Sequence, residues 1–225
     1  MIESATGIIL RTRPLTETSL IVLWLTPNCG RISTVAKGAR RPRSPFLGKL
    51  DLFYEADFLF SRSRRSELHP LREVSLRETN SALRQELGYL QQAGYGAALI
   101  QQATETETPL PAVFDLFRSL LGHLPKQPTQ PQTIFAFELK LLCELGLKPD
   151  LVKSRLTPGA KQIVNALWAN DWSAVARLQL SESQMMELRQ FLHGFLIFHL
   201  GRIPKGRMAG RPDLPETPVA PKLCP

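Results

Sequence analysis

The sequence predicts an α+β protein in which a small β-barrel precedes a mostly helical region. The first 76 residues form short runs rich in β-branched and aromatic side chains, separated by turn residues. From about Arg77 the apolar residues recur instead at three- and four-residue steps, which is the period of a helix. Five short strands within residues 1–78 are typical of a small closed barrel.

Five strands are expected, and alternation assigns their inward faces. The clearest is the apolar run between Ser19 and Thr26, which predicts a buried strand. The expected strands span residues 6–12, 19–26, 31–37, 51–60 and 67–76. In the third strand, alternation turns inward Ile32, Thr34 and Ala36. In the fourth it turns inward Leu52, Tyr54, Ala56, Phe58 and Phe60, and turns outward Asp51, Phe53, Glu55, Asp57 and Leu59.

Helices are expected from about Arg77 to the neighbourhood of Gly201. The first apolar period runs to Thr104, and Ser181 with Gln184 has the spacing of a capping box. Further helical patterns cover residues 110–124, 132–146, 158–169 and a segment after Ser181. Six prolines exclude a helix near the C-terminus. We therefore expect a barrel domain over 1–78, a helical domain over 79–203 and an extended or disordered tail over 204–225.

The composition is that of a globular chain with a surplus of positive charge. The chain has 225 residues, a mass of 25.3 kDa, a formal net charge of +8 and a pI near 9.8. Such a balance favours a polyanionic partner. The surplus lies at the two ends of the chain, since residues 79–200 hold ten basic and ten acidic side chains.

Cysteine usage and the N-terminal sequence bear on the cellular compartment. The three cysteines, Cys29, Cys143 and Cys224, are too far apart for a Cys-x-x-Cys metal site, and their number does not suit a disulfide framework. No basic segment followed by an apolar run begins the chain, and no stretch of about 18 apolar residues occurs. We therefore expect a cytosolic protein with no membrane partner, associated with the nucleoid if its ligand is DNA.

No catalytic or cofactor motif is present. The sequence has no Gly-x-Ser-x-Gly elbow, no Walker-type glycine loop and no His-Glu-x-x-His pair. The four histidines are expected to be structural, and so are the acidic groups Glu105/Glu107 and Asp51/Glu55/Asp57. The sequence therefore predicts no enzyme, no cofactor and no metal site, and a metal-dependent nuclease is the least supported class.

The strongest functional signal is a run of cations without any acidic residue between positions 31 and 49. Four of these cations fall within residues 37–43, among glycine and proline, so they can follow a phosphodiester backbone without helical geometry. Six contacts to a single strand would give a log–log salt slope of about −4. The candidate DNA-binding residues are Arg31, Lys37, Arg40, Arg41, Arg43 and Lys49.

Two alternatives to DNA binding stay open from these residues alone. The basic segment could be a solvated loop that binds nothing, or part of a protein-interaction scaffold that binds an acidic partner, with nucleic acid incidental. Aromatic side chains exposed on the barrel would support DNA binding, because bases stack on them. The candidates are Phe46 and Phe53, although packing within the sheet explains Phe53 equally well.

Beyond these patterns, the sequence resembles the RecO family of recombinational repair proteins. The resemblance is most specific in two N-terminal segments, Gly7-Ile8-Ile9-Leu10-Arg11-Thr12-Arg13-Pro14-Leu15-Thr16-Glu17-Thr18-Ser19-Leu20 and Gly30-Arg31-Ile32-Ser33-Thr34-Val35-Ala36-Lys37-Gly38-Ala39-Arg40-Arg41-Pro42. It continues through the Phe/Leu strand at 50–60. A weaker likeness covers residues 137–147 and 198–201.

This resemblance implies an OB barrel, a five-stranded fold, followed by a helical domain. It also implies binding of single- and double-stranded DNA, strand annealing without nucleotide hydrolysis, and partnership with RecR and single-strand DNA-binding protein in loading recombinase. By position, the family's basic loop motif falls on Lys37, Arg40 and Arg41. Arg43 and Lys49 are supported by their charge alone.

Two departures from the family pattern are visible. Many relatives carry a four-cysteine zinc module after the Glu-Leu-Gly segment, whereas residues 147–160 of this chain contain no cysteine, so no zinc is expected there. Where relatives often have Lys-Ser-Arg, this chain has Lys205-Gly206-Arg207, which weakens the expectation that this element contacts DNA.

Overall fold

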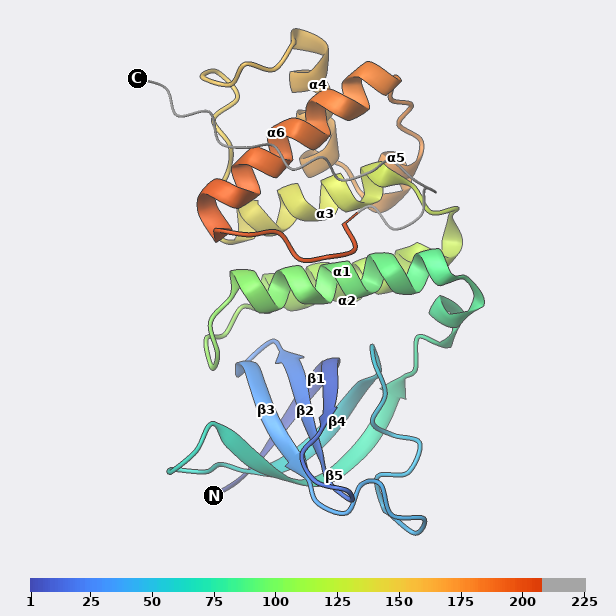
Figure 1. The fold of residues 1–225 in the computed structure, drawn as a ribbon, viewed down its shortest axis with the longest axis vertical. Helices are drawn as coiled ribbons and strands as arrows, with labels where there is room; N and C mark the ends of the chain where they lie inside the picture. Colours follow the sequence, from blue (N-terminus) through green and yellow to red (C-terminus); the bar gives the residue numbers. More distant parts are fainter. Residues whose placement is uncertain (208–225) are drawn as a thin grey trace.

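The computed structural model describes residues 1–207 and shows a barrel joined to a stack of helices (Figure 1). Five strands close the barrel in the order β1-β2-β3-β5-β4, which confirms the predicted fold class. The strands are β1 (Ile2–Pro14), β2 (Leu20–Thr26), β3 (Gly30–Ala36), β4 (Glu55–Ser61) and β5 (Leu68–Glu78). The β3–β5 pair is parallel and the other pairs are antiparallel.

The barrel interior is filled by the inward faces of its strands. Trp24 stacks on Phe58 with 4.1 Å between ring centroids, and its indole N–H donates to the Thr34 hydroxyl at 2.8 Å. Because that hydroxyl satisfies the buried indole, the largest side chain of the barrel is fixed in one orientation. The predicted inward face of β3 is confirmed, since Ile32, Thr34 and Ala36 are all buried.

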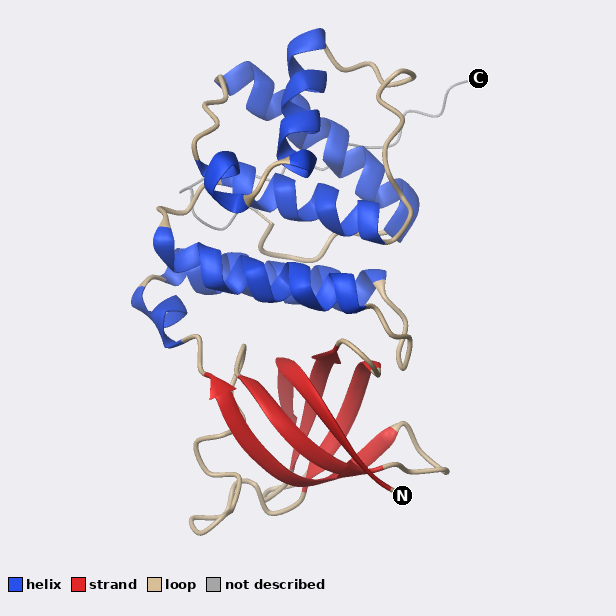
Figure 2. Ribbon diagram, turned by 180° about the vertical axis from the view of Figure 1, so that it is seen from behind, coloured by secondary structure: helices blue, strands red, loops and turns tan. Residues whose placement is uncertain are grey.

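The helices form two layers beyond the barrel (Figure 2). The first layer, α1 and α2, crosses one side of the barrel, and the other helices pack on its far side. The helices are α1 (Leu87–Ala103), α2 (Pro111–His123), α3 (Pro131–Glu144), α4 (Pro158–Ala169), α5 (Trp172–Ala176) and α6 (Glu182–Leu200). The predicted capping box is present at Ser181 and Gln184, and α6 ends at Gly201, whose φ is 75°.

The strand predicted over residues 51–54 is absent, because the fourth strand begins only at Glu55. Phe53 has a φ of 67° and packs outside the barrel interior against the helices, where its ring meets Phe117 edge-on at 6.3 Å. Glu55 is 3% exposed and accepts from Arg118 of α2 at 2.9 Å, so it is not on a solvated face. Phe53 and Glu55 do point away from the barrel interior as predicted, but the helices cover that face, so both are buried. Ala56, Phe58 and Phe60 face the barrel core as predicted.

Two further differences concern the helical region. Strand β5 continues to Glu78, and α1 begins only at Leu87, after a short 3₁₀ turn at Ser81–Gln85. Helix α5 is too short to have produced a helical period in the sequence. Of the predicted tail, residues 208–225 lie outside the described part of the chain.

The loop between α1 and α2 joins the helices to the barrel. Its Glu107 accepts from His69 at 2.9 Å and from Arg62 at 3.1 Å, and Arg62 also binds both oxygens of Glu3. Gly30 has a φ of 65° and lies so close to Thr108 that a Cβ would come within 2.2 Å of its carbonyl oxygen. The start of β3 is therefore held against this loop.

Candidate nucleic-acid interface

The loop that follows β3 is folded against the end of the barrel. Ala39 and Phe46 are buried and belong to the barrel core, so the loop closes the barrel between them. Two bonds join it to the β1–β2 connection: the Arg40 backbone N–H donates to the Thr18 carbonyl at 2.9 Å, and the Gly38 N–H donates to the Ser19 hydroxyl at 3.4 Å. These anchors leave the charged side chains of the loop directed outward.

Five predicted cations of this loop remain available to a ligand. Four of them are exposed and the fifth, Lys49, is partly exposed. Within residues 1–207, no acidic side chain forms an ion pair with any of the five. We call this set the loop cations: Lys37, Arg40, Arg41, Arg43 and Lys49. Their charge is uncompensated, which is the condition for attracting a polyanion.

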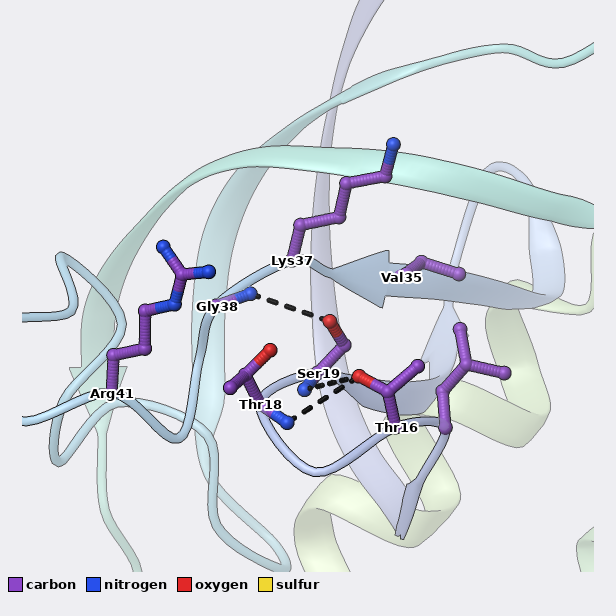
Figure 3. A pocket seen from close by; sticks show the side chains of 8 residues that line it. Thr16, Thr18, Ser19, Val35, Lys37, Gly38 and Arg41 are labelled. Carbon is purple, nitrogen blue, oxygen red and sulfur yellow. Dashed lines mark hydrogen bonds between the residues drawn. The ribbon is translucent and has the colours of Figure 1, made fainter.

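A pocket of about 370 Å³ lies where this loop meets the β1–β2 connection (Figure 3). Lys37 and Arg41 stand on either side of the Gly38 turn, and the hydroxyl groups of the β1–β2 connection lie below them. Its lining residues are Leu15, Thr16, Thr18, Ser19, Val35, Lys37, Gly38 and Arg41. We call it the cationic pocket. Two cations beside hydroxyl donors form a suitable site for a phosphate, which accepts hydrogen bonds through every oxygen.

Arg31 does not belong with the loop cations. Its guanidinium donates to the Thr104 hydroxyl at 2.7 Å and to the Thr104 carbonyl, at the C-terminal end of α1. Burial lowers the pKa of Arg31, and its side chain is committed to joining β3 to the α1–α2 loop. Arg31 is a predicted DNA-binding residue, and these bonds to Thr104 make it a poorer candidate than the loop cations.

Two exposed arginines of β1 were missed by sequence reasoning. Arg13 pairs in register with Ile21, which pairs with Val35 of the cationic pocket, so the three side chains share the outer face of the sheet. Arg11 lies two residues away on the same face. The alternation Arg-Thr-Arg before the β1–β2 turn was the available signal, but only the strand register places it beside the loop.

Neither of the two candidate stacking aromatics is exposed on the barrel surface. Phe46 is 7% exposed and packs in the barrel core, and Phe53 is 2% exposed and packs against the helices. The Lys205-Gly206-Arg207 element is also occupied in part. Arg207 binds both oxygens of the fully buried Glu138 at 2.7 Å, so this arginine is a structural residue.

The described residues also bear on metals and membranes. Within residues 1–207, no group of three or more His, Cys, Asp or Glu side chains could hold a metal ion. The segment at 147–160 has neither cysteine nor histidine, so it does not fit the zinc module of many relatives. No helix in the described part of the chain is long and apolar enough to span a bilayer.

The protein is of the α+β class: a closed five-stranded barrel of the OB type precedes a helical region. One end of the barrel carries the loop cations, which have no acidic partner within residues 1–207. Two family models match the chain, "Recombination protein O N terminal" over residues 1–80 and "Recombination protein O C terminal" over residues 84–155. The chain belongs to the RecO family of DNA repair proteins.

Similar proteins agree with this assignment. The chain is 30% identical to the DNA repair protein RecO of Anaeromyxobacter dehalogenans (strain 2CP-C), over 94% of this chain and 95% of that relative. It is 32% identical to the RecO of Alkaliphilus metalliredigens (strain QYMF), over 67% of this chain and 61% of that protein. It is 34% identical to the RecO of Rhodopirellula baltica, over 64% of this chain and 53% of that protein.

Proposed function

We propose that this chain is a non-enzymatic DNA-binding and strand-annealing mediator of recombinational repair. The observation that carries the proposal is the set of loop cations, none of which has an acidic partner within residues 1–207. Two of them, Lys37 and Arg41, line a pocket suited to phosphate. Membership of the RecO family supports DNA as the polyanion.

Annealing follows from charge neutralisation at this surface. Two complementary strands repel each other through their phosphates, and a surface that binds phosphates without reading bases lowers that repulsion. The loop is suited to this role because its backbone is anchored to the barrel while its long side chains reach into solvent. No covalent bond is made or broken in this mechanism, so it requires neither a nucleophile nor a metal.

We infer that the helical region contributes docking surfaces for RecR and for single-strand DNA-binding protein. The family resemblance supports these partners, and the balanced charge of residues 79–200 makes this region a poorer ligand for DNA than the barrel. The barrel would then hold the strand while the helices recruit the proteins that load recombinase.

The proposal is tested by an annealing assay with fluorescent complementary oligonucleotides. The wild type should accelerate pairing, and a Lys37→Ala/Arg40→Ala/Arg41→Ala triple variant should lose most of that acceleration. The matched control is a triple variant of exposed cations in the helical region that also removes one lysine and two arginines: Lys126→Ala, Arg155→Ala and Arg177→Ala. After incubation of the wild type with the two complementary strands, Mg²⁺ and ATP, both strands should be recovered at full length.

Three outcomes would count against the proposal. Annealing by the loop variant at the wild-type rate would place the site elsewhere, and cleavage of the strands that requires the protein would make it an enzyme. If the wild type bound an acidic peptide but neither bound nor annealed DNA, the protein would be an interaction scaffold.

A further inference from the structure

A second pocket opens on the other side of the loop that carries the cations. It has a volume of about 290 Å³, just below the roughly 300–1,000 Å³ typical of small-molecule pockets. Its lining is mainly apolar and includes Leu20, Phe46, Leu47, Leu50 and Tyr54, with Asp51 as the charged member. We call it the apolar pocket.

The two pockets share a wall. Ser19 lines the cationic pocket and the next residue, Leu20, lines the apolar one. In the loop after β3, Gly38 likewise lines the cationic pocket and the next residue, Ala39, lines the apolar one. Consecutive Cα atoms are about 3.8 Å apart, so the polar and apolar sites adjoin at both crossings. A phosphate between Lys37 and Arg41 would bring its nucleoside beside the apolar pocket.

We propose that the apolar pocket receives an unpaired nucleobase of the DNA strand whose phosphate occupies the cationic pocket; this inference rests on the proposed function. Leu47 is 64% exposed although it lies between the cations Arg43 and Lys49. A polyanion drawn to those cations meets this leucine directly. Apolar side chains presented in this way pack against bases or between base steps.

The aromatic wall of the pocket is held in place from the helical side. The Arg84 guanidinium lies 5.3 Å from the centroid of the Tyr54 ring and binds the Asp51 carboxylate at 2.8 Å. This arginine therefore orients the ring and offsets the negative charge that would repel DNA. The remaining acceptor capacity of Asp51 suits an amino group on a base edge.

The chemistry of the neighbouring pocket favours a base over other apolar occupants. An acyl chain or an apolar peptide would gain nothing from the five loop cations, whereas a nucleotide presents a phosphate and a planar apolar ring within one unit. A base stacked and paired in a duplex cannot enter such a pocket without being extruded. The site therefore favours single strands over duplex DNA.

The test compares two fluorescent single strands of equal length, one with ordinary bases and one with abasic sugars on the same phosphate backbone. Wild-type protein should bind the strand with bases about five- to tenfold more tightly, the lower part of the range for one stacked base. A Leu47→Ser variant should lower this preference roughly twofold or more, because one apolar wall is removed. Its salt dependence should stay unchanged, because every cation is retained.

Leu87→Ser is the matched control, because Leu87 is 70% exposed at the start of α1 and lines neither pocket. Equal affinity of the wild type for both strands, with salt-dependent binding intact, would overturn the base pocket and leave the proposed function standing. A full base preference in Leu47→Ser, or an equal loss in Leu87→Ser, would also overturn it. Binding to neither strand would overturn the proposed function itself.

Discussion

Arginine side chains in this protein serve two different purposes. Arg62 and Arg118 bind carboxylates of the barrel, so their donors are already used within the fold. Arg40, Arg41 and Arg43 extend from the loop after β3 with no acidic neighbour among the described residues. The partner of each guanidinium, rather than its place in the sequence, decides whether it can bind a phosphate.

The buried pair of Arg207 and Glu138 makes the C-terminal segment part of the fold. Burial raises the pKa of Tyr95, which therefore stays neutral and donates its hydroxyl hydrogen to Glu138 at 2.5 Å. Arg207→Ala should lower the free energy of unfolding by about 3–5 kcal/mol, since it leaves the Glu138 carboxylate buried without a counter-charge. Chemical denaturation measures this loss. An Arg207→Met/Glu138→Gln double variant should recover part of it, and a single variant as stable as wild type would contradict the assignment.

The Glu3–Arg62 pair gives a dependence of stability on pH. The hydrogen bond from Arg62 holds the pKa of Glu3 below its usual value, so the charged form is favoured in the folded state. The stabilisation is present above the unfolded pKa of about 4.3 and is lost as the pH falls through the folded pKa. Glu3→Gln should therefore cost up to about 1 kcal/mol at pH 7 and progressively less below about pH 4. Urea unfolding at several pH values measures the difference, and a constant cost across this range would contradict it.

At the scale of elements, β3 contacts the α1–α2 loop at one end and leads to the cationic pocket at the other. Its first residues meet the α1–α2 loop through Gly30 and Arg31, and its last residues lead into the cationic pocket. Seven residues at about 3.3 Å each separate the two ends by roughly 20 Å. The strand is therefore a rigid spacer between the helical region and the proposed DNA surface.

The variant Arg31→Ala tests whether Arg31 has a structural role that the loop cations do not have. Removing it should reduce the free energy of unfolding by about 1.5–3 kcal/mol, because a charged donor to Thr104 is removed. The log–log salt slope of DNA binding should not change. Thermal unfolding and salt-titrated anisotropy on the same preparation test both parts, and a slope reduced with unchanged stability would return Arg31 to the DNA surface.

The elements could be predicted where periodicity is uninterrupted. The inward face of β3 and the cap of α6 follow from short local patterns, and both are confirmed. Residues 51–54 could not be placed in this way, because the positive φ of Phe53 breaks the two-residue period just before β4. The short helix α5 contains less than two full turns, too few for a periodic signal.

The candidate site could be predicted only in part, for a related reason. The charge run from Lys37 to Lys49 is local and visible in the sequence. The commitment of Arg31 to Thr104, however, depends on a contact across more than 70 residues, and the place of Arg13 depends on strand register. Tertiary contacts of this kind carry no pattern in a single sequence.

At the scale of the whole molecule, the proposed surface for nucleic acid lies on the barrel, and residues 79–200 have balanced charge. The outer face of β1 extends the cationic surface through Arg11 and Arg13. Arg11→Ala/Arg13→Ala should make the salt slope of single-strand binding shallower by about 1.4, because each neutralised phosphate of a single strand contributes about 0.7 to the slope. Anisotropy titrations at several salt concentrations measure this change, and an unaltered slope would confine the surface to the loop.

The most direct test of the central claim, that the end of the barrel holds phosphates, is the salt dependence of single-strand binding. Five loop cations predict a log–log slope of about −3.5, and the two β1 arginines would bring it to about −5. The Lys37→Ala/Arg40→Ala/Arg41→Ala variant should have a slope shallower by about 2, whereas the Lys126→Ala/Arg155→Ala/Arg177→Ala variant should keep the wild-type slope. Equal slopes for the wild type and the loop variant would contradict the claim.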